Sequence, residues 1–227
     1  MLKLALFLLL VSQVFATYYA VDFTDQASLD QLKCLQNLNY QMIKPRVSKA
    51  NGEVDFNGIQ TILTMQQNND KIGFYVVGVI TPQVNVTDGG LLQIYKLQQA
   101  MIGYQIYNYG TLALQITRDS APWSSDQTAN SALINSMIGY LKADFNIDIF
   151  TTYADWVAIT GNSAGIPGYV FLWYSNVFGA GVTGESPPNY NDFVAFGSWN
   201  KSGVVSKQFA VGENLCGLNV NRDVHVV

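Results

Sequence analysis

Two polar side chains stand at the end of an apolar strand pattern in the middle of the chain. In residues 110–119, leucine and isoleucine occupy every second position, so one side of the predicted strand is apolar and the other ends in Gln115 and Thr117. Catalytic residues are normally mounted at the carboxyl end of such a strand in a barrel or doubly wound sheet. Neither an amide nor a hydroxyl titrates near neutral pH, so the pattern predicts a catalytic strand that lacks its acids.

Carboxylates occur on either side of this strand. Asp22 lies at the end of the first apolar segment, Tyr18 to Phe23, where a barrel would use it. Asp119 lies two residues beyond Thr117 and is the nearby candidate for a replacement acid, provided that it folds back toward the strand end. The alternative for Asp119 is a solvated loop residue or a charge at the entry of a helix.

A second motif has the spacing of a serine nucleophile. Gly161-Asn-Ser163-Ala-Gly165 matches G-x-S-x-G, and Asp192 and His225 follow in the order of α/β-hydrolases. That turn must open a helix, whereas Pro167 and a glycine come directly after it, so an esterase is not favoured. His225 is also the sole histidine, which argues against histidine metal sites and histidine bases; no metal or cofactor is expected.

The apolar periodicity predicts the elements that would position these residues. Strands alternate with helices over the first two-thirds of the chain, and a tail of strands follows. Strands are expected at 18–23, 40–48, 72–80, 110–119, 147–152, 168–175, 194–199, 204–211 and 218–224, and helices at 28–39, around 59–63, at 91–101, from Asp126 to Leu141 and at 153–159. Five strand–helix units before a strand-only tail favour a parallel α/β sheet closed into a small barrel.

The first 16 residues have the pattern of a secretory signal peptide. Lys3 precedes the apolar run Leu4 to Leu10, and a small residue, Ala16, ends the segment. A membrane span would need about 20 apolar residues, which this run does not reach. We expect secretion, and a single domain over residues 17–227.

The two cysteines and two sequons fit an extracellular protein. Cys34 and Cys216 lie near opposite ends of the mature chain and are expected to form a disulfide, the alternative being two buried thiols. Asn85 and Asn200 each begin an Asn-x-Ser/Thr triplet and could carry glycans.

Composition limits the partners. Hydrophobic residues make up 49% and charged residues 12% of the chain, which excludes disorder. Without Lys3, eleven basic residues face 16 acidic ones, and no basic run is present. Nucleic acid is therefore not expected as a partner, no membrane span is expected, and the protein is predicted to be a monomer.

Several segments together resemble a known family. In order along the chain they are Tyr-Ala-Val-Asp22, Thr-Leu-Ala-Leu-Gln115-Ile-Thr117, Trp123-Ser-Ser-Asp, Ile-Phe-Thr-Thr-Tyr153, Phe-Leu-Trp173-Tyr, Phe-Gly-Ser-Trp199, Lys-Gln208-Phe and Cys216-Gly. They resemble the nematode lysozymes of glycoside hydrolase family 25, the Chalaropsis-type muramidases. The resemblance implies a flattened TIM-like (β/α)5β3 barrel with five helices and eight strands, secretion, a role in innate immunity, and peptidoglycan as the partner.

The chain departs from the family where the chemistry is done. The family cuts the β-1,4 bond after N-acetylmuramic acid with an Asp-x-Glu pair on the central strand, an Asp on the first strand and an Asp near the chain end. Here Asp22 matches the first-strand acid, but Gln115, Thr117 and Asn221 stand in place of the others. Glycoside cleavage needs one carboxylic acid and a second carboxylate. Losing a positioned general acid alone costs about 10²- to 10⁴-fold in rate.

Three classes of function therefore remain open. The favoured one is a secreted lysozyme-like protein, catalytically impaired, that binds peptidoglycan in the old cleft. The second is an active muramidase with Asp119 as a relocated acid, and the third a structural or signalling barrel without a glycan ligand. The expected ligand-binding residues are Asp22, Gln115, Thr117, Tyr153, Trp173, Trp199 and Asn221. For the three aromatic residues among them, packing in the core is the alternative to a sugar-stacking wall.

Overall fold

The computed structural model describes residues 17–106 and 110–226. The predicted signal peptide lies outside the described residues. The described chain forms eight strands and five α-helices: β1 (Thr17–Phe23), α1 (Leu29–Asn37), β2 (Tyr40–Ser48), α2 (Phe56–Gln67), β3 (Tyr75–Ile80), α3 (Leu91–Gly103), β4 (Thr111–Gln115), α4 (Gln127–Leu141), β5 (Asn146–Thr151), α5 (Tyr153–Thr160), β6 (Val170–Ser175), β7 (Val204–Leu215) and β8 (Leu218–Val226). Two short 3-10 turns, Val182–Gly184 and Lys201–Gly203, lie between β6 and β7.

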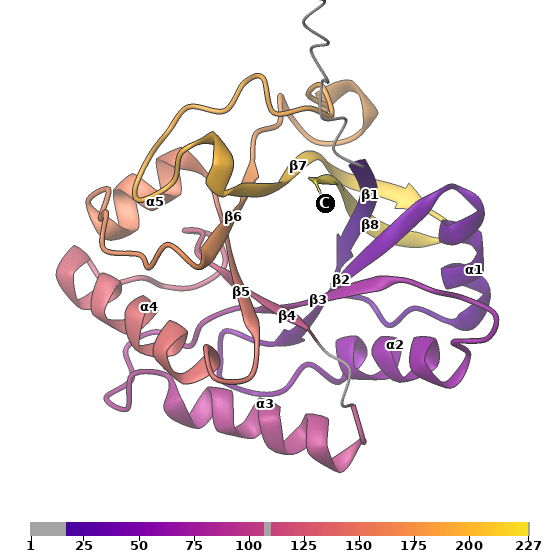
Figure 1. The fold of residues 1–227 in the computed structure, drawn as a ribbon, viewed down its shortest axis with the longest axis horizontal. Helices are drawn as coiled ribbons and strands as arrows, with labels where there is room; N and C mark the ends of the chain where they lie inside the picture. Colours follow the sequence, from indigo (N-terminus) through magenta and orange to yellow (C-terminus); the bar gives the residue numbers. More distant parts are fainter. Residues whose placement is uncertain (1–16, 107–109, 227) are drawn as a thin grey trace, which may run out of the picture.

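The eight strands close into one barrel in sequence order. Strands β1 to β7 are parallel to their neighbours, and β8 is antiparallel to both β7 and β1, which closes the ring. Figure 1 looks along the barrel, with the strands as an inner ring and helices α1 to α5 around much of its outside. The predicted α/β barrel, of the (β/α)5β3 type, is confirmed.

Most of the apolar core lies between the helices and the outer faces of the strands. Inside the barrel, a smaller apolar group is formed by Ala20, Met42, Val77, Val79, Ala113, Phe150 and Trp173. Alternate residues of each strand point inward, so on the parallel strands the residues two positions after these lie toward the carboxyl end of the barrel, and those two positions before lie toward the amino end. The barrel interior is therefore filled in the middle and can form pockets at its ends.

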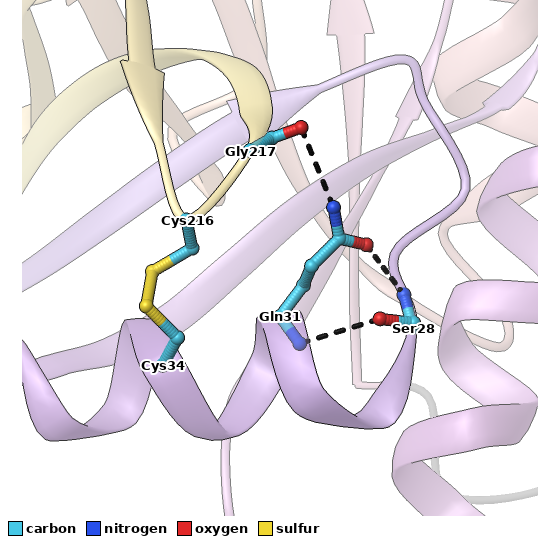
Figure 2. The surroundings of a disulfide bond; sticks show 5 residues. All are labelled: Ser28, Gln31, Cys34, Cys216 and Gly217. Carbon is cyan, nitrogen blue, oxygen red and sulfur yellow. Dashed lines mark hydrogen bonds between the residues drawn. A yellow bond between two sulfur atoms is a disulfide. The ribbon is translucent and has the colours of Figure 1, made fainter.

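Helix α1 and the β7–β8 turn are fastened together, as Figure 2 shows. The Cys34–Cys216 disulfide joins them, as predicted, across a sequence separation of 182 residues. Ser28 and Gln31 form a reciprocal capping box, and Gln31 Nε2 also donates to the carbonyl of Gly217 at 3.4 Å. Cys216 and Gly217 both have positive φ, as a two-residue hairpin turn requires. The hairpin is thus held to the first helix by a covalent bond and a hydrogen bond.

Three sequence predictions about elements are wrong in detail. The expected strand at 194–199 is an irregular segment with a single bridge between Phe196 and Trp199, because these two rings pack into the core while Val194 is exposed. The strand expected from Ile72 begins at Tyr75, although Ile72 is buried in the core before it. The central strand ends at Gln115, so Thr117 lies beyond it.

Candidate functional site

Asp22 is held at the carboxyl end of β1 by two amide groups from the tail of the chain. Asn221 Nδ2 donates to Asp22 Oδ1 at 2.7 Å, and Gln208 Nε2 donates to Asp22 Oδ2 at 2.8 Å. Asn221 is the residue directly opposite Asp22 in the β1–β8 pairing, which explains its approach. Burial raises the pKa of Asp22, while the hydrogen bonds from Gln208 and Asn221 oppose the rise. Each carboxyl oxygen of Asp22 thus already has a donor.

A small pocket opens beside this carboxyl group. It has a volume of about 130 Å³ and is called here the carboxyl-end pocket. Its lining includes Asp22, Gln115, Trp173 and Asn221, four of the residues that the sequence singled out, and also Phe23, Thr24, Lys44, Arg46, Val79 and Phe150. Gln115 points its Oε1 toward Thr81, whose hydroxyl donates to it at 2.9 Å. The pocket therefore presents one carboxyl group together with two basic side chains, Lys44 and Arg46, two amides and apolar side chains.

Lys44 contributes a buried ammonium group to the lining of this pocket. It stands opposite Asp22 in the β1–β2 pairing, and its side chain is 1% exposed. Its ammonium donates to Ser206 Oγ at 2.6 Å and lies 3.6 Å from Asp223 Oδ2. Burial lowers the pKa of Lys44, and the nearby carboxylates, Asp223 first, oppose that change. The sequence analysis did not single out Lys44, because its partners come from distant strands.

Asp223 supplies a second carboxylate, but it lies deeper in the barrel. It follows Asn221 by two residues on β8, so both side chains share the inward face. Asp223 is 0% exposed, and its Oδ1 accepts a 2.7 Å hydrogen bond from Trp173 Nε1. Burial raises the pKa of Asp223 well above its usual range, with Lys44 opposing the rise. Asp223 does not line the carboxyl-end pocket.

Thr117 and Asp119 lie away from the carboxyl-end pocket. Thr117 is 5% exposed, and its hydroxyl has no hydrogen-bond partner among the described residues. Its carbonyl accepts hydrogen bonds from Trp123 Nε1 and Ser120 Oγ, which fix the turn after β4. Asp119 is exposed within that turn. Neither side chain lines the carboxyl-end pocket.

A larger groove adjoins this end of the barrel, at the carboxyl ends of β5 and β6. It has a volume of about 600 Å³ and is called here the side groove. Tyr153 lines it, is 56% exposed, and packs edge-on against Phe196 with ring centres 5.6 Å apart. The groove is linked to Asp22 through Gln208, because Ser175, which lines the groove, donates to Gln208 Oε1 at 2.9 Å.

Of the two tryptophans expected to bind a ligand, Trp173 lines the carboxyl-end pocket and Trp199 does not. Trp173 lines the carboxyl-end pocket but is almost completely buried between Phe150 and Lys44. Trp199 is 4% exposed and packs against Trp156, and its Nε1 donates to the carbonyl of Val170. Trp199 thus takes the core position that was the alternative in the sequence, and it lines neither the carboxyl-end pocket nor the side groove.

The residues of the G-x-S-x-G motif do not form a catalytic triad. Ser163 Oγ accepts from Gly165 N within its own turn. Asp192 is bound by Lys207, Tyr174 and Asn176, and His225 lines a pocket at the amino ends of the strands. None of the three triad candidates hydrogen-bonds another in the described part of the chain, so the esterase alternative is not supported.

The remaining predicted positions lie on the surface. Asn85 and Asn200 are both exposed, and Asn200 caps the short turn that begins at Lys201.

Among the described residues no cluster of three or more His, Cys, Asp or Glu side chains could hold a metal ion. Within the same residues, no helix has the length and apolarity needed to cross a membrane.

A closed barrel of five β/α units followed by three strands, the last of them antiparallel to both neighbours, is the fold of the family-25 muramidase barrels. The structure of a family GH25 lysozyme from Aspergillus fumigatus matches with a TM-score of 0.65 at 12% identity, covering 92% of this chain and 94% of that one. The family model described as lysozyme-like protein 1 matches residues 13–209. The chain belongs to this lysozyme-like family.

Two relatives show how far the similarity extends. Lysozyme-like protein 1 of Caenorhabditis elegans is 36% identical over 210 residues, which are 92% of this chain and 68% of that protein. Probable GH family 25 lysozyme 4 of Dictyostelium discoideum is 28% identical over 223 residues, covering 94% of this chain and 95% of the relative. The resemblance drawn from the sequence motifs is confirmed at the level of family and fold.

Proposed function

We propose that this chain is a secreted lysozyme-like protein of antibacterial defence that binds peptidoglycan at the carboxyl end of its barrel and is impaired in hydrolysing it. The observation that carries the proposal is the content of the carboxyl-end pocket, where Asp22 is the one acidic residue in the lining. A glycosidase of this kind uses two carboxyl groups about 5 to 9.5 Å apart, on either side of the scissile bond. Gln115 and Asn221 occupy places where acids would serve.

The electrostatics of the pocket support impaired catalysis. The transition state of glycoside cleavage carries positive charge on the sugar ring, and carboxylates stabilise it. Lys44 also lines the pocket and brings a buried positive charge close to Asp22. A cation at this place opposes the developing charge, so the pocket favours a bound neutral sugar over the transition state.

The polar groups around the pocket support binding of an uncharged glycan. Gln115 retains amide hydrogens that could donate to a sugar, since the contact it makes with Thr81 uses its oxygen. The exposed ring of Tyr153 in the side groove is a surface on which a sugar ring could stack. Trp173 is too deeply buried to stack on a ligand, and Trp199 faces the core, so we leave both out of the proposed sugar-contacting set.

Secretion is supported by the disulfide, which persists in oxidising compartments. The proposal also includes four features expected from the sequence. They are a signal peptide at residues 1–16, glycans on Asn85 and Asn200, a monomeric state and a role in immunity. The exposed positions of both asparagines are compatible with glycosylation.

One observation favours residual hydrolysis as a second candidate. Burial raises the pKa of Asp22, which favours a protonated carboxyl group; donation to a leaving oxygen would require Asn221 or Gln208 to give up its hydrogen bond to that group. Asp119, the relocated acid considered from the sequence, lies in an exposed turn and is a weaker candidate.

The test is to incubate the secreted protein with purified peptidoglycan and to measure released reducing ends and co-sedimentation together. We expect co-sedimentation with few or no reducing ends. Tyr153→Ala should weaken co-sedimentation, whereas Tyr169→Ala, which changes an exposed tyrosine outside the side groove, should not. Reducing ends that disappear in Asp22→Asn would establish residual hydrolysis, and reducing ends that disappear in Asp119→Ala would establish the relocated acid. Absence of co-sedimentation would leave a barrel without a glycan ligand.

A further inference from the structure

A second end of the barrel holds a pocket that the proposed glycan site does not use. It lies at the amino ends of β1 to β7 and the end of β8, has a volume of about 600 Å³, and is called here the amino-end pocket. Its lining is mostly apolar and aromatic and consists of Tyr18, Met42, Met65, Phe74, Tyr75, Val76, Val77, Gly110, Thr111, Asn146, Asp148, Phe171, Val205 and His225. A pocket of this size, apolar with few polar groups, is typical of sites for small organic molecules.

Asp148 is the acidic group in this lining. It is 5% exposed, and no hydrogen bond from the described residues reaches its carboxyl group. Burial raises the pKa of Asp148 to about 7, and the charge of Lys44 opposes the rise. Lys44 itself is engaged by Ser206 and Asp223. A buried carboxylate is costly without a partner, and the described residues donate no hydrogen bond to this one, so its oxygens can accept hydrogen bonds from a ligand in the pocket.

His225 adds a second unsatisfied polar group. Its Nδ1 is buried without a hydrogen-bond partner in the described part of the chain. Burial, and then the charge of Lys44, lower the pKa of His225 to about 3. The imidazole is therefore neutral between pH 5 and 8 and does not supply the positive charge that Asp148 lacks.

Aromatic rings line the same pocket. Tyr18 and Tyr75 stack with ring centres 5.5 Å apart and an angle of 21° between their planes. Phe171 also lines the pocket and is partly exposed. Faces of aromatic rings attract cations as well as apolar groups. The lining thus combines an acid that accepts no hydrogen bond from the described residues with surfaces that suit an organic cation.

We propose that the amino-end pocket binds an organic ammonium ion, a primary or secondary amine on an apolar body, whose N–H groups donate to Asp148 while the body packs against the aromatic rings. A neutral apolar ligand would leave the acid without a partner, and an anion would be repelled by it. A metal ion is a poorer fit, because the described residues form no cluster of three or more metal-ligating side chains. The proposal concerns the end of the barrel opposite Asp22 and is independent of the glycan site.

The test uses calorimetry on the mature protein at pH 8 with three probes of similar shape. The probes are 2-phenylethylamine, 2-phenylethanol and 3-phenylpropionate, which carry a cationic, a neutral and an anionic end. We expect the amine to bind at least tenfold more tightly than the alcohol, and the anion not to bind. Asp148→Asn should reduce the affinity for the amine to that for the alcohol, whereas Asp144→Asn, which removes an exposed charge four residues away, should leave it unchanged.

A second measurement locates the amine in the unmodified protein, in case Asp148→Asn does not fold. Amide chemical shifts of Thr111, Asp148 and His225 should move on titration with 2-phenylethylamine, and those of Asp22 and Gln115 should not. Failure of the amine to bind, equal affinities for amine and alcohol, or shifts confined to the Asp22 end would each overturn the proposal.

Discussion

The ammonium nitrogen of Lys44 lies 3.6 Å from the centre of the Trp173 ring. The same ring donates through its Nε1 to Asp223, the carboxylate that Lys44 also approaches. Cation, ring and anion therefore form one buried unit in the middle of the barrel. Lys44 and Trp173 line the carboxyl-end pocket, and the charge of Lys44 also acts on Asp148 in the amino-end pocket, so this unit influences both sites.

Lys44→Met should destabilise the protein strongly. The substitution leaves Asp223 buried without its cation, and breaking a buried ion pair in this way costs about 3 to 5 kcal/mol in the free energy of unfolding. Urea unfolding at pH 7 measures the loss. The double variant Lys44→Met/Asp223→Asn should recover much of it, since neither charge then remains. A single variant as stable as the native protein would contradict the ion pair.

Asp148→Asn should change how stability depends on pH. The pKa of Asp148 is raised in the folded state, so the folded protein binds the extra proton and its stability falls as the pH rises from about 4 to 7. The asparagine variant lacks this fall, so its stability relative to the native protein should increase over that range, by up to about 4 kcal/mol. Thermal unfolding at several pH values is the measurement. A constant difference between variant and native protein would rule out the raised pKa.

His225→Gln should give the opposite pH dependence. The pKa of His225 is lowered on folding, so the unfolded chain binds the proton first and the native protein gains stability as the pH rises from about 3 to 6.5. The variant lacks that gain and should fall behind the native protein over the same range. Carrying out both series together is informative because the native curve contains two nearly cancelling contributions. Parallel curves for His225→Gln and the native protein would be the contrary result.

Restoring acids should restore catalysis. Gln115→Asp together with Thr117→Glu returns the pair that the resemblance calls for, and positioned general acids contribute about 10²- to 10⁴-fold in rate. We expect release of reducing ends from peptidoglycan to rise by at least tenfold. Gln115→Asn with Thr117→Gln is the matched control, with similar volumes and no acid. Because residue 117 lies beyond the end of β4, the rate increase requires the glutamate side chain to extend back to the carboxyl-end pocket. A folded double variant without a rate increase would show that the carboxyl group of residue 117 does not reach that pocket.

Reduction of the disulfide should lower stability without changing the barrel. For a loop of this length the chain-entropy model gives about 5 kcal/mol as an upper value. Cys34→Ser/Cys216→Ser should therefore unfold at clearly lower denaturant concentration and keep the native far-ultraviolet circular dichroism spectrum. Equal unfolding midpoints would mean that packing of α1 against the hairpin is sufficient alone.

The strand–helix order and the meeting of Asp22, Gln115 and Asn221 could be predicted from sequence. Periodicity marks the strands, and the rule that parallel strands place functional groups at their carboxyl ends brings Asp22 and Gln115 together. Asn221 lies on the antiparallel strand β8, and its place beside them follows from the family resemblance. Prediction failed where tertiary packing decides. Val194–Trp199 has a strand-like composition, but its aromatic rings are taken up by the core, so it does not pair as a strand.

The buried ionic residues were also missed, and the reason is physical. A single lysine or aspartate in a strand looks like a solvent-facing residue until barrel closure brings partners from distant strands. Lys44 meets Ser206 and Asp223, more than 160 residues away in sequence. The same closure places Gln208 on Asp22 across a separation of 186 residues. Such contacts leave no local pattern.

The bond between Cys34 and Cys216 has a further consequence for survival among proteases. It turns most of the chain into a covalent ring, so one cut anywhere between the two cysteines leaves the pieces joined. The connection between β6 and β7 carries exposed sites such as Phe178 and Val182, where an enzyme could cut. After such a nick the two parts stay tethered, and their reassociation remains a reaction within one molecule. A protein digested at this loop would therefore lose continuity of its backbone before it lost its fold.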